Sequence, residues 1–199
     1  VIGYTGPSSN GDKAIAVLKV YQSLNDDGEI VKMIKGVTSN GETVTWEYET
    51  ENGGETPVKD TMYTYNDYDD DNKYELHNPA TEADANVTDG NTVAAGDITV
   101  DANDKSLVVD GTRVYFADGV KFIFFNDGKA VVKDGVQKVA SDATNVWVTI
   151  KMDGTTAYAT AVYVGGTTAA SSTTSDDLVF VVAGAQGSVQ VTVDGKDKT

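Results

Sequence analysis

Residues 121–130 are Lys-Phe-Ile-Phe-Phe-Asn-Asp-Gly-Lys-Ala, an apolar run that ends at Asp127-Gly128 and is followed at once by another run of strand-forming residues. Asp-Gly suits a type I′ turn because both central residues take a positive φ, and this twist matches the strands on either side. Eight Asp-Gly and three Asn-Gly dipeptides occur in the 199 residues. The short runs between them are rich in Val, Ile, Thr and Tyr, which favour strands. The sequence therefore predicts an all-β chain of antiparallel hairpins and meanders, in small sandwich or barrel-like units with little or no helix.

The first predicted strand, Ala14 to Tyr21, is apolar on both faces. Its alternate residues form two apolar sets, one with Ile15 and Val17 and the other with Ala16 and Leu18. A strand of this kind is typical of the inside of a sandwich or barrel. Two further runs, 30–34 and 43–48, follow after tight turns, and the second alternates apolar with polar residues as a half-exposed strand does. These three strands are predicted to form a meander.

More strands are expected along the rest of the chain. Runs 62–65 and 73–76 are predicted to form a hairpin closed by the acidic turn 66–72. The other predicted strands are 98–100, 106–109, 113–116, 120–125, 129–133, 146–151 and 157–164. No stretch shows a convincing helical period, so any helix is expected only as a turn near residues 137–144 or 79–85.

The order of elements at the start of the chain recurs near its end. A linker, an apolar strand, a turn and another strand come again about 160 residues later, as in tandem arrays. The predicted organisation is a leading linker over 1–13, a first β subdomain over 14–97, a second over 98–166, a Ser/Thr-rich linker over 167–177 and the opening hairpin of a next repeat over 178–199.

The charge balance limits the classes of partner. The chain has 31 Asp and Glu against 15 Lys and Arg, a formal net charge of -16, and no cysteine. Nucleic acid and anionic membrane surfaces are disfavoured, because binding them depends on clustered Lys and Arg. No apolar stretch approaches the roughly 20 residues that cross a bilayer, so membrane insertion is not expected. Divalent cations and cationic partners are the natural counter-species, and an acidic surface that only keeps the protein soluble is the alternative.

Several runs together resemble the β-rich repeats of bacterial cell-surface proteins that carry S-layer homology modules. The runs are 109–116, 121–130, 135–139 and 157–164, with 63–65 and 73–76 in the same style. The resemblance covers about two thirds of the chain and depends on patterning rather than on an invariant motif. It implies a Gram-positive-type envelope protein displayed outside the cell. The S-layer homology module itself is absent from this sequence, so no anchoring residues are carried over.

The acidic turn offers candidate metal ligands. Asp67, Asp69, Asp71 and Glu75 place oxygen atoms at positions 1, 3, 5 and 9 of a loop that could hold calcium. Position 6 is Asn72 rather than Gly, which argues against an EF-hand and leaves a looser calcium turn. The alternative is an exposed hairpin tip, since Asp and Asn are good turn formers. The wider stretch 47–75 has ten acids and two bases, so the repulsion between its carboxylates would also favour cations.

The same region is rich in aromatic residues. Tyr48, Tyr63, Tyr65, Tyr68 and Tyr74 fall within it, and Trp46 immediately precedes it. Aromatic faces near carboxylates are typical of carbohydrate sites, whereas the alternation of Val44, Trp46 and Tyr48 favours core packing for Trp46.

Enzymatic function is not expected. The single histidine, His77, rules out a multi-histidine metal centre, and no nucleophile elbow, P-loop or dinucleotide motif is present. A glycosidase needs only two carboxylates and stays open on composition alone.

The sequence as a whole predicts a non-catalytic, extracellular structural or display module on a bacterial surface. Its expected partners are neighbouring repeat units of the same polypeptide and cell-wall polysaccharide. The alternative is a calcium-assisted adhesive or carbohydrate-binding module that uses residues 47–75.

Overall fold

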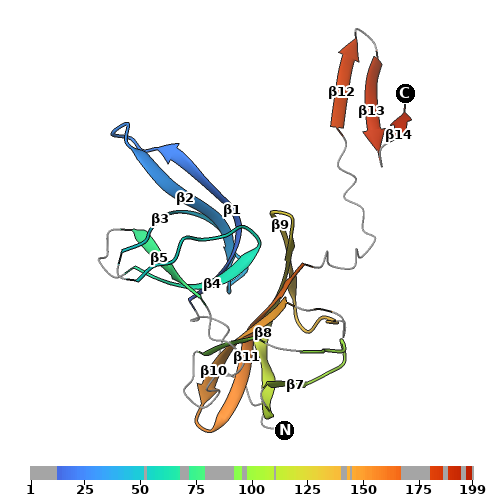
Figure 1. Ribbon diagram of the computed structural model, residues 1–199. Coiled ribbons are helices and arrows are strands. Elements are labelled where there is room, and N and C mark those ends of the chain that lie inside the picture. Colours follow the sequence, from blue (N-terminus) through green and yellow to red (C-terminus); the bar gives the residue numbers. More distant parts are fainter. Residues whose placement is uncertain are drawn as a thin grey trace. The chain divides into compact units, whose positions relative to one another are not determined.

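The chain is described by a computed structural model, in which every element of regular structure is a strand (Figure 1). The described residues are 13–51, 53–67, 72–78, 92–95, 98–109, 111–139, 143, 145–166, 180–185, 188–193 and 196–198. Among them there is no helix, so the predicted all-β class is confirmed. The chain divides into two units, Val1–Thr168 and Ala169–Thr199.

No helix long and apolar enough to span a membrane occurs in the part of the chain that the structure describes.

A closed five-stranded barrel forms the first half of the larger unit. Its strands are β1 (Ala14–Leu24), β2 (Ile30–Thr38), β3 (Thr43–Glu49), β4 (Thr61–Asn66) and β5 (Lys73–His77). The order around the barrel is β1-β2-β3-β5-β4, in which β3 and β5 are parallel and the other pairs are antiparallel. Because β4 lies beside β1, the first four strands form a Greek key. A five-stranded Greek-key barrel is also the architecture of OB folds, and such an architecture does not define a function.

The local sequence explains the meander and the hairpin of this barrel. Gly28 and Gly41 follow β1 and β2 with φ of 79° and 80°, the left-handed conformation that the Asp-Gly and Asn-Gly dipeptides favour. The predicted pairing of 62–65 with 73–76 is confirmed, since Tyr65 lies opposite Leu76 in the antiparallel β4–β5 pair.

From Ala14 to Leu18, strand β1 is buried on both faces because this part of it belongs to two cores. Inside the barrel, Ile15 and Val17 pack with buried side chains from the other four strands: Ile34, Tyr48, Tyr63 and Leu76. Outside the barrel, Ala14, Ala16 and Leu18 pack with residues of β2, β4 and a second sheet. The register with β2 shifts between Val17 and Lys19. This bulge inverts the alternation, so Val20 packs on the inner core rather than with Leu18.

The second sheet covers the outer face of β1. Its strands are β6 (Thr92–Ala95), β7 (Ser106–Val109), β8 (Thr112–Asn126), β9 (Lys129–Asp134), β10 (Asn145–Asp153) and β11 (Thr156–Gly165). They are ordered β6-β10-β11-β8-β7, and β9 pairs with β8. Ile123 and Phe125 of β8 and Ala161 and Tyr163 of β11 complete the core around β1. The Tyr163 hydroxyl also donates a hydrogen bond of 3.0 Å to the carbonyl oxygen of Ala14.

Two details of the second sheet differ from the predictions. Residues 113–116 and 120–125 belong to one strand, β8, instead of two strands joined by a turn at Asp118-Gly119. Gly119 has a φ of 75°, and the β8–β11 register shifts across this position, so the dipeptide forms a bulge within a strand held by its parallel neighbour. The predicted strand 98–100 forms only an isolated bridge, between Val100 and Val139.

The smaller unit contains a three-stranded antiparallel sheet. Its strands are β12 (Phe180–Ala185), β13 (Ser188–Val193) and β14 (Lys196–Lys198), in that order. The predicted Ser/Thr-rich linker over 167–177 lies outside the described residues. The division into subdomains and a next repeat stays a prediction.

Candidate functional site

The predicted calcium ligands are only partly described. Asp69 and Asp71 lie outside the described residues, as does Tyr68 of the aromatic set. Asp67 follows β4, and its Oδ2 accepts a 3.2 Å hydrogen bond from the backbone N–H of Asn72, so it helps to close the turn. Within the described part of the chain, no three His, Asp or Glu side chains come together in a way that could hold a metal ion. Calcium binding at the turn stays a prediction.

Glu75, the fourth predicted ligand, is fully buried. It lies on β5 between Glu49 of β3 and Asn66 of β4. The chain near Gly54 covers this position so closely that a Cβ at Gly54 would lie 3.2 Å from the Cβ of Glu75. A buried carboxyl group requires polar partners, and Glu75 has interactions within the fold. Glu75 is therefore enclosed by the fold, whereas Asp67 is half-exposed to solvent.

His77, the single histidine, ends β5. Its carbonyl oxygen accepts a 3.3 Å hydrogen bond from the Thr64 hydroxyl, and its imidazole Nε2 is buried. No cluster of acids forms a metal-type group with it among the residues that the structure describes.

Three of the predicted aromatic residues meet at one end of the barrel core. Trp46 stacks on Tyr74 with ring centroids 4.1 Å apart and contacts Tyr65 at 4.7 Å. They come from β3, β5 and β4, and Tyr65 and Tyr74 lie on either side of residues 66–72, the predicted acidic turn. Trp46 and Tyr65 are partly buried against the barrel core, so the packing role that alternation predicted for Trp46 agrees with the structure. The use of this aromatic cluster for sugar binding stays a prediction.

Burial changes the acidity of two tyrosines in this region. Desolvation raises the pKa of Tyr65, and the negative charges that Tyr74 and Glu42 would carry raise it further. Desolvation also raises the pKa of Tyr48, which is buried next to the cluster. Both phenols therefore stay neutral to a higher pH than an exposed tyrosine.

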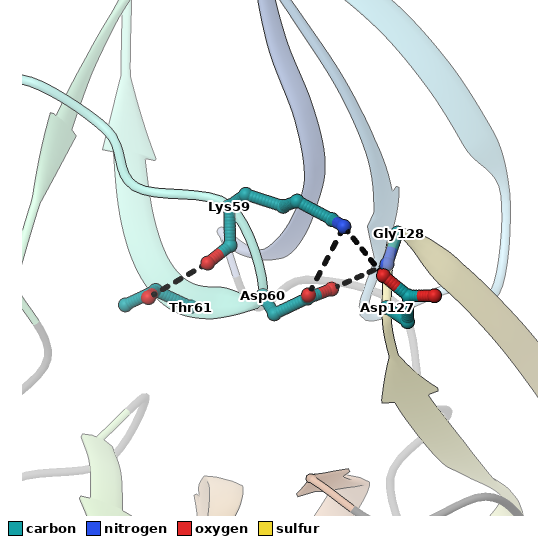
Figure 2. Close-up of polar contacts among 5 residues, drawn as sticks. All are labelled: Lys59, Asp60, Thr61, Asp127 and Gly128. Carbon is teal, nitrogen blue, oxygen red and sulfur yellow. Dashed lines mark hydrogen bonds and ion pairs between the residues drawn. The ribbon is translucent and has the colours of Figure 1, made fainter.

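A polar joint connects the barrel to the second sheet (Figure 2). The Lys59 Nζ donates a 2.9 Å hydrogen bond to Asp127 Oδ1 and lies 3.7 Å from Asp60 Oδ2. The Asp60 Oδ1 accepts a 2.8 Å hydrogen bond from the backbone N–H of Gly128. The segment before β4 is thereby attached to the turn between β8 and β9.

The joint fixes both backbones in an uncommon conformation. Asp60 and Asp127 have φ of 58° and 48°, a region that Asp tolerates better than most residues. The hydrogen bond to Asp127 raises the pKa of Lys59, and the same bond lowers the pKa of Asp127. Both side chains are substantially exposed, so their ion pair contributes little to stability. The half-buried bond from Gly128 to Asp60 is the more specific contact.

Sequence reasoning missed this joint. The sequence predicts only a turn at Asp127-Gly128, and it marks Asp60 only as one acid of the stretch 47–75. The two segments are 68 positions apart, and the only local signal is Lys59, a lone base between Glu47 and Asp71.

The joint and the aromatic cluster differ in what they can do. The joint is engaged in holding two parts of the fold together, whereas the aromatic cluster borders the acidic turn and is partly exposed.

No protein-family model, no curated protein and no solved structure matches this chain.

Proposed function

We propose that the chain is a non-catalytic structural or display module of a bacterial cell-surface protein of the S-layer-like kind, located outside the cell. The observation that carries this proposal is the core that β1 shares with β8 and β11. Strand β1 contributes to the barrel core on one face and to the core with the second sheet on the other face. Each half of the larger unit is therefore stabilised by packing on the other. Burying each large side chain of such a core stabilises a fold by about 1.5–3 kcal/mol.

Two further features support a module of this kind. The net charge of -16 favours a soluble, well-hydrated surface. The antiparallel order β12-β13-β14 agrees in its pattern with the order β1-β2-β3, as expected for a next repeat. Neighbouring repeat units of the same polypeptide are the proposed partners, and cell-wall polysaccharide is the second class.

Surface labelling of the producing bacterium tests the proposal. Antibodies raised against this chain are expected to label intact cells, and external protease is expected to remove the label without lysing them. Labelling that appears only after lysis would refute the extracellular location. A full-length protein that loses wall attachment when residues 13–166 are deleted would instead make this region an anchor.

The alternative function is a calcium-assisted adhesive or carbohydrate-binding module. The observation that favours it is the aromatic cluster of Trp46, Tyr65 and Tyr74 beside the acidic turn. Calcium bound at Asp67 and its neighbours would stabilise the folded chain by mass action. The melting temperature in calcium is therefore compared with that in sodium chloride of equal ionic strength, and Asp67→Asn serves as the control variant.

Glycan binding has its own readout. In a Trp147→Phe background the only indole is Trp46, so its fluorescence reports on the aromatic cluster alone. A saturable change on titration with wall polysaccharide supports the alternative. A flat titration together with an unshifted melting temperature rules it out in favour of the structural module.

A further inference from the structure

The outer half of the β1–β2 hairpin is a two-stranded ribbon that extends beyond the barrel (Figure 1). β1 pairs with β4 only from Ala14 to Val17, and β2 pairs with β3 only from Met33 to Val37. Among the residues that the structure describes, the two strands beyond this point pair only with each other, up to the last pair, Leu24 with Ile30. We call the segment Leu24–Ile30 the tip.

The tip has a fixed conformation. The Asn25 Oδ1 accepts hydrogen bonds from the backbone N–H groups of Asp27, at 3.1 Å, and Glu29, at 2.8 Å. The Gly28 N–H donates to the Asn25 carbonyl oxygen at 3.0 Å, and Gly28 takes a φ of 79°. A loop that is already ordered loses less entropy when it binds.

The tip presents apolar and acidic groups together. Leu24 is 66% exposed and Ile30 is 71% exposed, the two most exposed large apolar side chains described, and they line a shallow depression with Gln22 and Ser23. Three exposed acids, Asp26, Asp27 and Glu29, lie between them in the chain, and no Lys or Arg occurs between residues 20 and 31. Within the described part of the chain none of these acids forms an ion pair.

A surface of the opposite character lies on β9. Lys129, Val131 and Lys133 share one face because side chains alternate along a strand, and Ala130 on the other face packs on the core around β1. Val131 is 47% exposed. Neither lysine lies within ion-pair distance of a described carboxylate, although the charge of Lys129 helps to lower the pKa of Asp127. Among the described strands, β9 pairs only with β8. We call this face the β9 face.

The two surfaces are complementary in charge and in apolar content. Residues 14–97 carry eighteen Asp and Glu against five Lys, whereas residues 98–166 carry eight against seven Lys and Arg. Lys129 and Lys133 are about 13 Å apart along an extended strand, which leaves room for a two-stranded tip to place its apolar pair over Val131 with acids beside each lysine.

The tip cannot reach the β9 face of its own chain. Gly41, which follows β2, packs so closely on Val132 of β9 that a Cβ at Gly41 would lie 2.8 Å from its Cγ1. Ile30 is at the opposite end of β2, a strand of nine residues, and a strand of that length spans about 30 Å. Any contact between the two surfaces is therefore between molecules.

We infer that the tip of one copy docks on the β9 face of a second copy. The contact joins two different surfaces, so copies associate head to tail and can grow beyond a dimer, into a ring or an open chain. This inference rests on the proposed structural role and names the partner as another copy of the same chain.

The contact is smaller than the roughly 1,200 Å² of stable interfaces, so its dissociation constant is on the order of 0.1–1 mM. Modules held together on one surface reach effective concentrations of about that size.

Two complementary variants test the docking. Leu24→Ser with Ile30→Ser removes the apolar part of the tip and keeps the β9 face; Val131→Ser does the reverse. All three side chains are exposed, so the fold is expected to persist, and circular dichroism checks it. Sedimentation equilibrium in about 0.15 M salt, where repulsion is screened beyond roughly 8 Å, measures mass against concentration. Val108→Ser, at a residue 56% exposed on β7, is the matched control.

The expected outcomes are specific to head-to-tail docking. The wild-type chain and the Val108→Ser control associate beyond dimers as concentration rises, and each docking variant alone stays monomeric. An equal mixture of the two docking variants forms dimers and nothing larger, because only one tip and one β9 face remain per pair.

Other results would overturn the inference. These are a wild-type chain that is monomeric at 1 mM, docking variants that associate like the wild type, or a mixture that stays monomeric. None of these outcomes bears on the surface location, which the labelling of intact cells decides separately.

Discussion

Replacing Tyr163 by Phe is expected to lower the stability of both halves of the larger unit together. Tyr163 is fully buried, and its hydroxyl donates the 3.0 Å bond to the Ala14 carbonyl oxygen that links β11 to β1. The substitution keeps the ring in the shared core and removes only this hydroxyl. It therefore isolates the polar link from the packing.

The expected loss is about 1 kcal/mol. The net contribution of one hydrogen bond to the free energy of unfolding is about 0.5–1.5 kcal/mol. An acceptor left without any partner in a dry core would lower the stability further. The Ala14 oxygen avoids that penalty because it also accepts a 3.1 Å hydrogen bond from the backbone N–H of Ser39. For a fold of this size, 1 kcal/mol corresponds to a fall in Tm of about 2–4 °C.

Urea unfolding followed at two indoles measures the effect. Trp46 packs on the barrel core, and Trp147 packs on the shared core and stacks on Phe125 at 6.1 Å. Two single-tryptophan variants are used, one with Trp147→Phe and one with Trp46→Phe. The fluorescence of the remaining indole then reports on the barrel in the first variant and on the shared core in the second. Tyr115→Phe, at a tyrosine 42% exposed, is the control and is expected to change stability by less than about 0.5 kcal/mol.

The result that would refute the reasoning is a shift at one indole alone. Separate transitions would mean that the barrel and the second sheet do not share the core around β1. A loss no larger than that of the Tyr115→Phe control would mean that the bond to Ala14 contributes nothing.

Three other changes have defined outcomes. Gly36→Ala is expected to cost about 1–3 kcal/mol in urea unfolding, because the new Cβ would lie 2.6 Å from the Ile15 Cδ1 and 2.7 Å from a backbone oxygen; a variant of wild-type stability would contradict the β1–β2 register. Lys59→Met removes the ion pair between Lys59 and Asp127. The stabilisation from this pair is fully present above about pH 3.8, because the pKa of Asp127 is lowered, and below about pH 10.5, because the pKa of Lys59 is raised. The stability difference between wild type and Lys59→Met should thus shrink as the pH falls through the pKa of Asp127 and as it rises through that of Lys59, and a difference that is the same at pH 3 and pH 7 would argue against the joint. The raised pKa of Tyr65 makes its neutral form favour the folded state, so stability should fall above about pH 10, and Tyr65→Phe should reduce that fall; an unchanged alkaline profile would count against its burial.

Local pattern was sufficient for much of the fold. The apolar residues on both faces of Ala14 to Tyr21 predicted a strand inside a sandwich or barrel, and the alternation at Val44, Trp46 and Tyr48 predicted the inward face of β3. These features depend on residues within one strand. Side-chain alternation and turn chemistry act over that distance.

Features that depend on distant residues could not be predicted in this way. The parallel pairs β3–β5 and β8–β11 bring together strands that do not follow each other in the chain, and no local signal identifies a partner strand. Gly119 adopts the positive φ of a turn residue inside a continuous strand because β11 holds both halves of β8. The joint of Lys59 with Asp127 likewise depends on contacts made only after folding.

For the candidate site, the sequence placed the aromatic residues from Trp46 to Tyr74 in one acidic region but did not show that three of them contact one another. It also did not show that Glu75 is buried while Asp67 closes the turn. Burial of a polar group depends on which segment covers it, and for Glu75 that segment is the chain near Gly54.

The contact between β1 and β11 affects how the larger unit responds to a pulling force. Ala14 begins the first strand of this unit and Tyr163 lies near the end of its last strand, 149 positions later, yet the two residues touch. Tension applied to the chain on both sides of the unit therefore passes directly from one strand to the other through their common core.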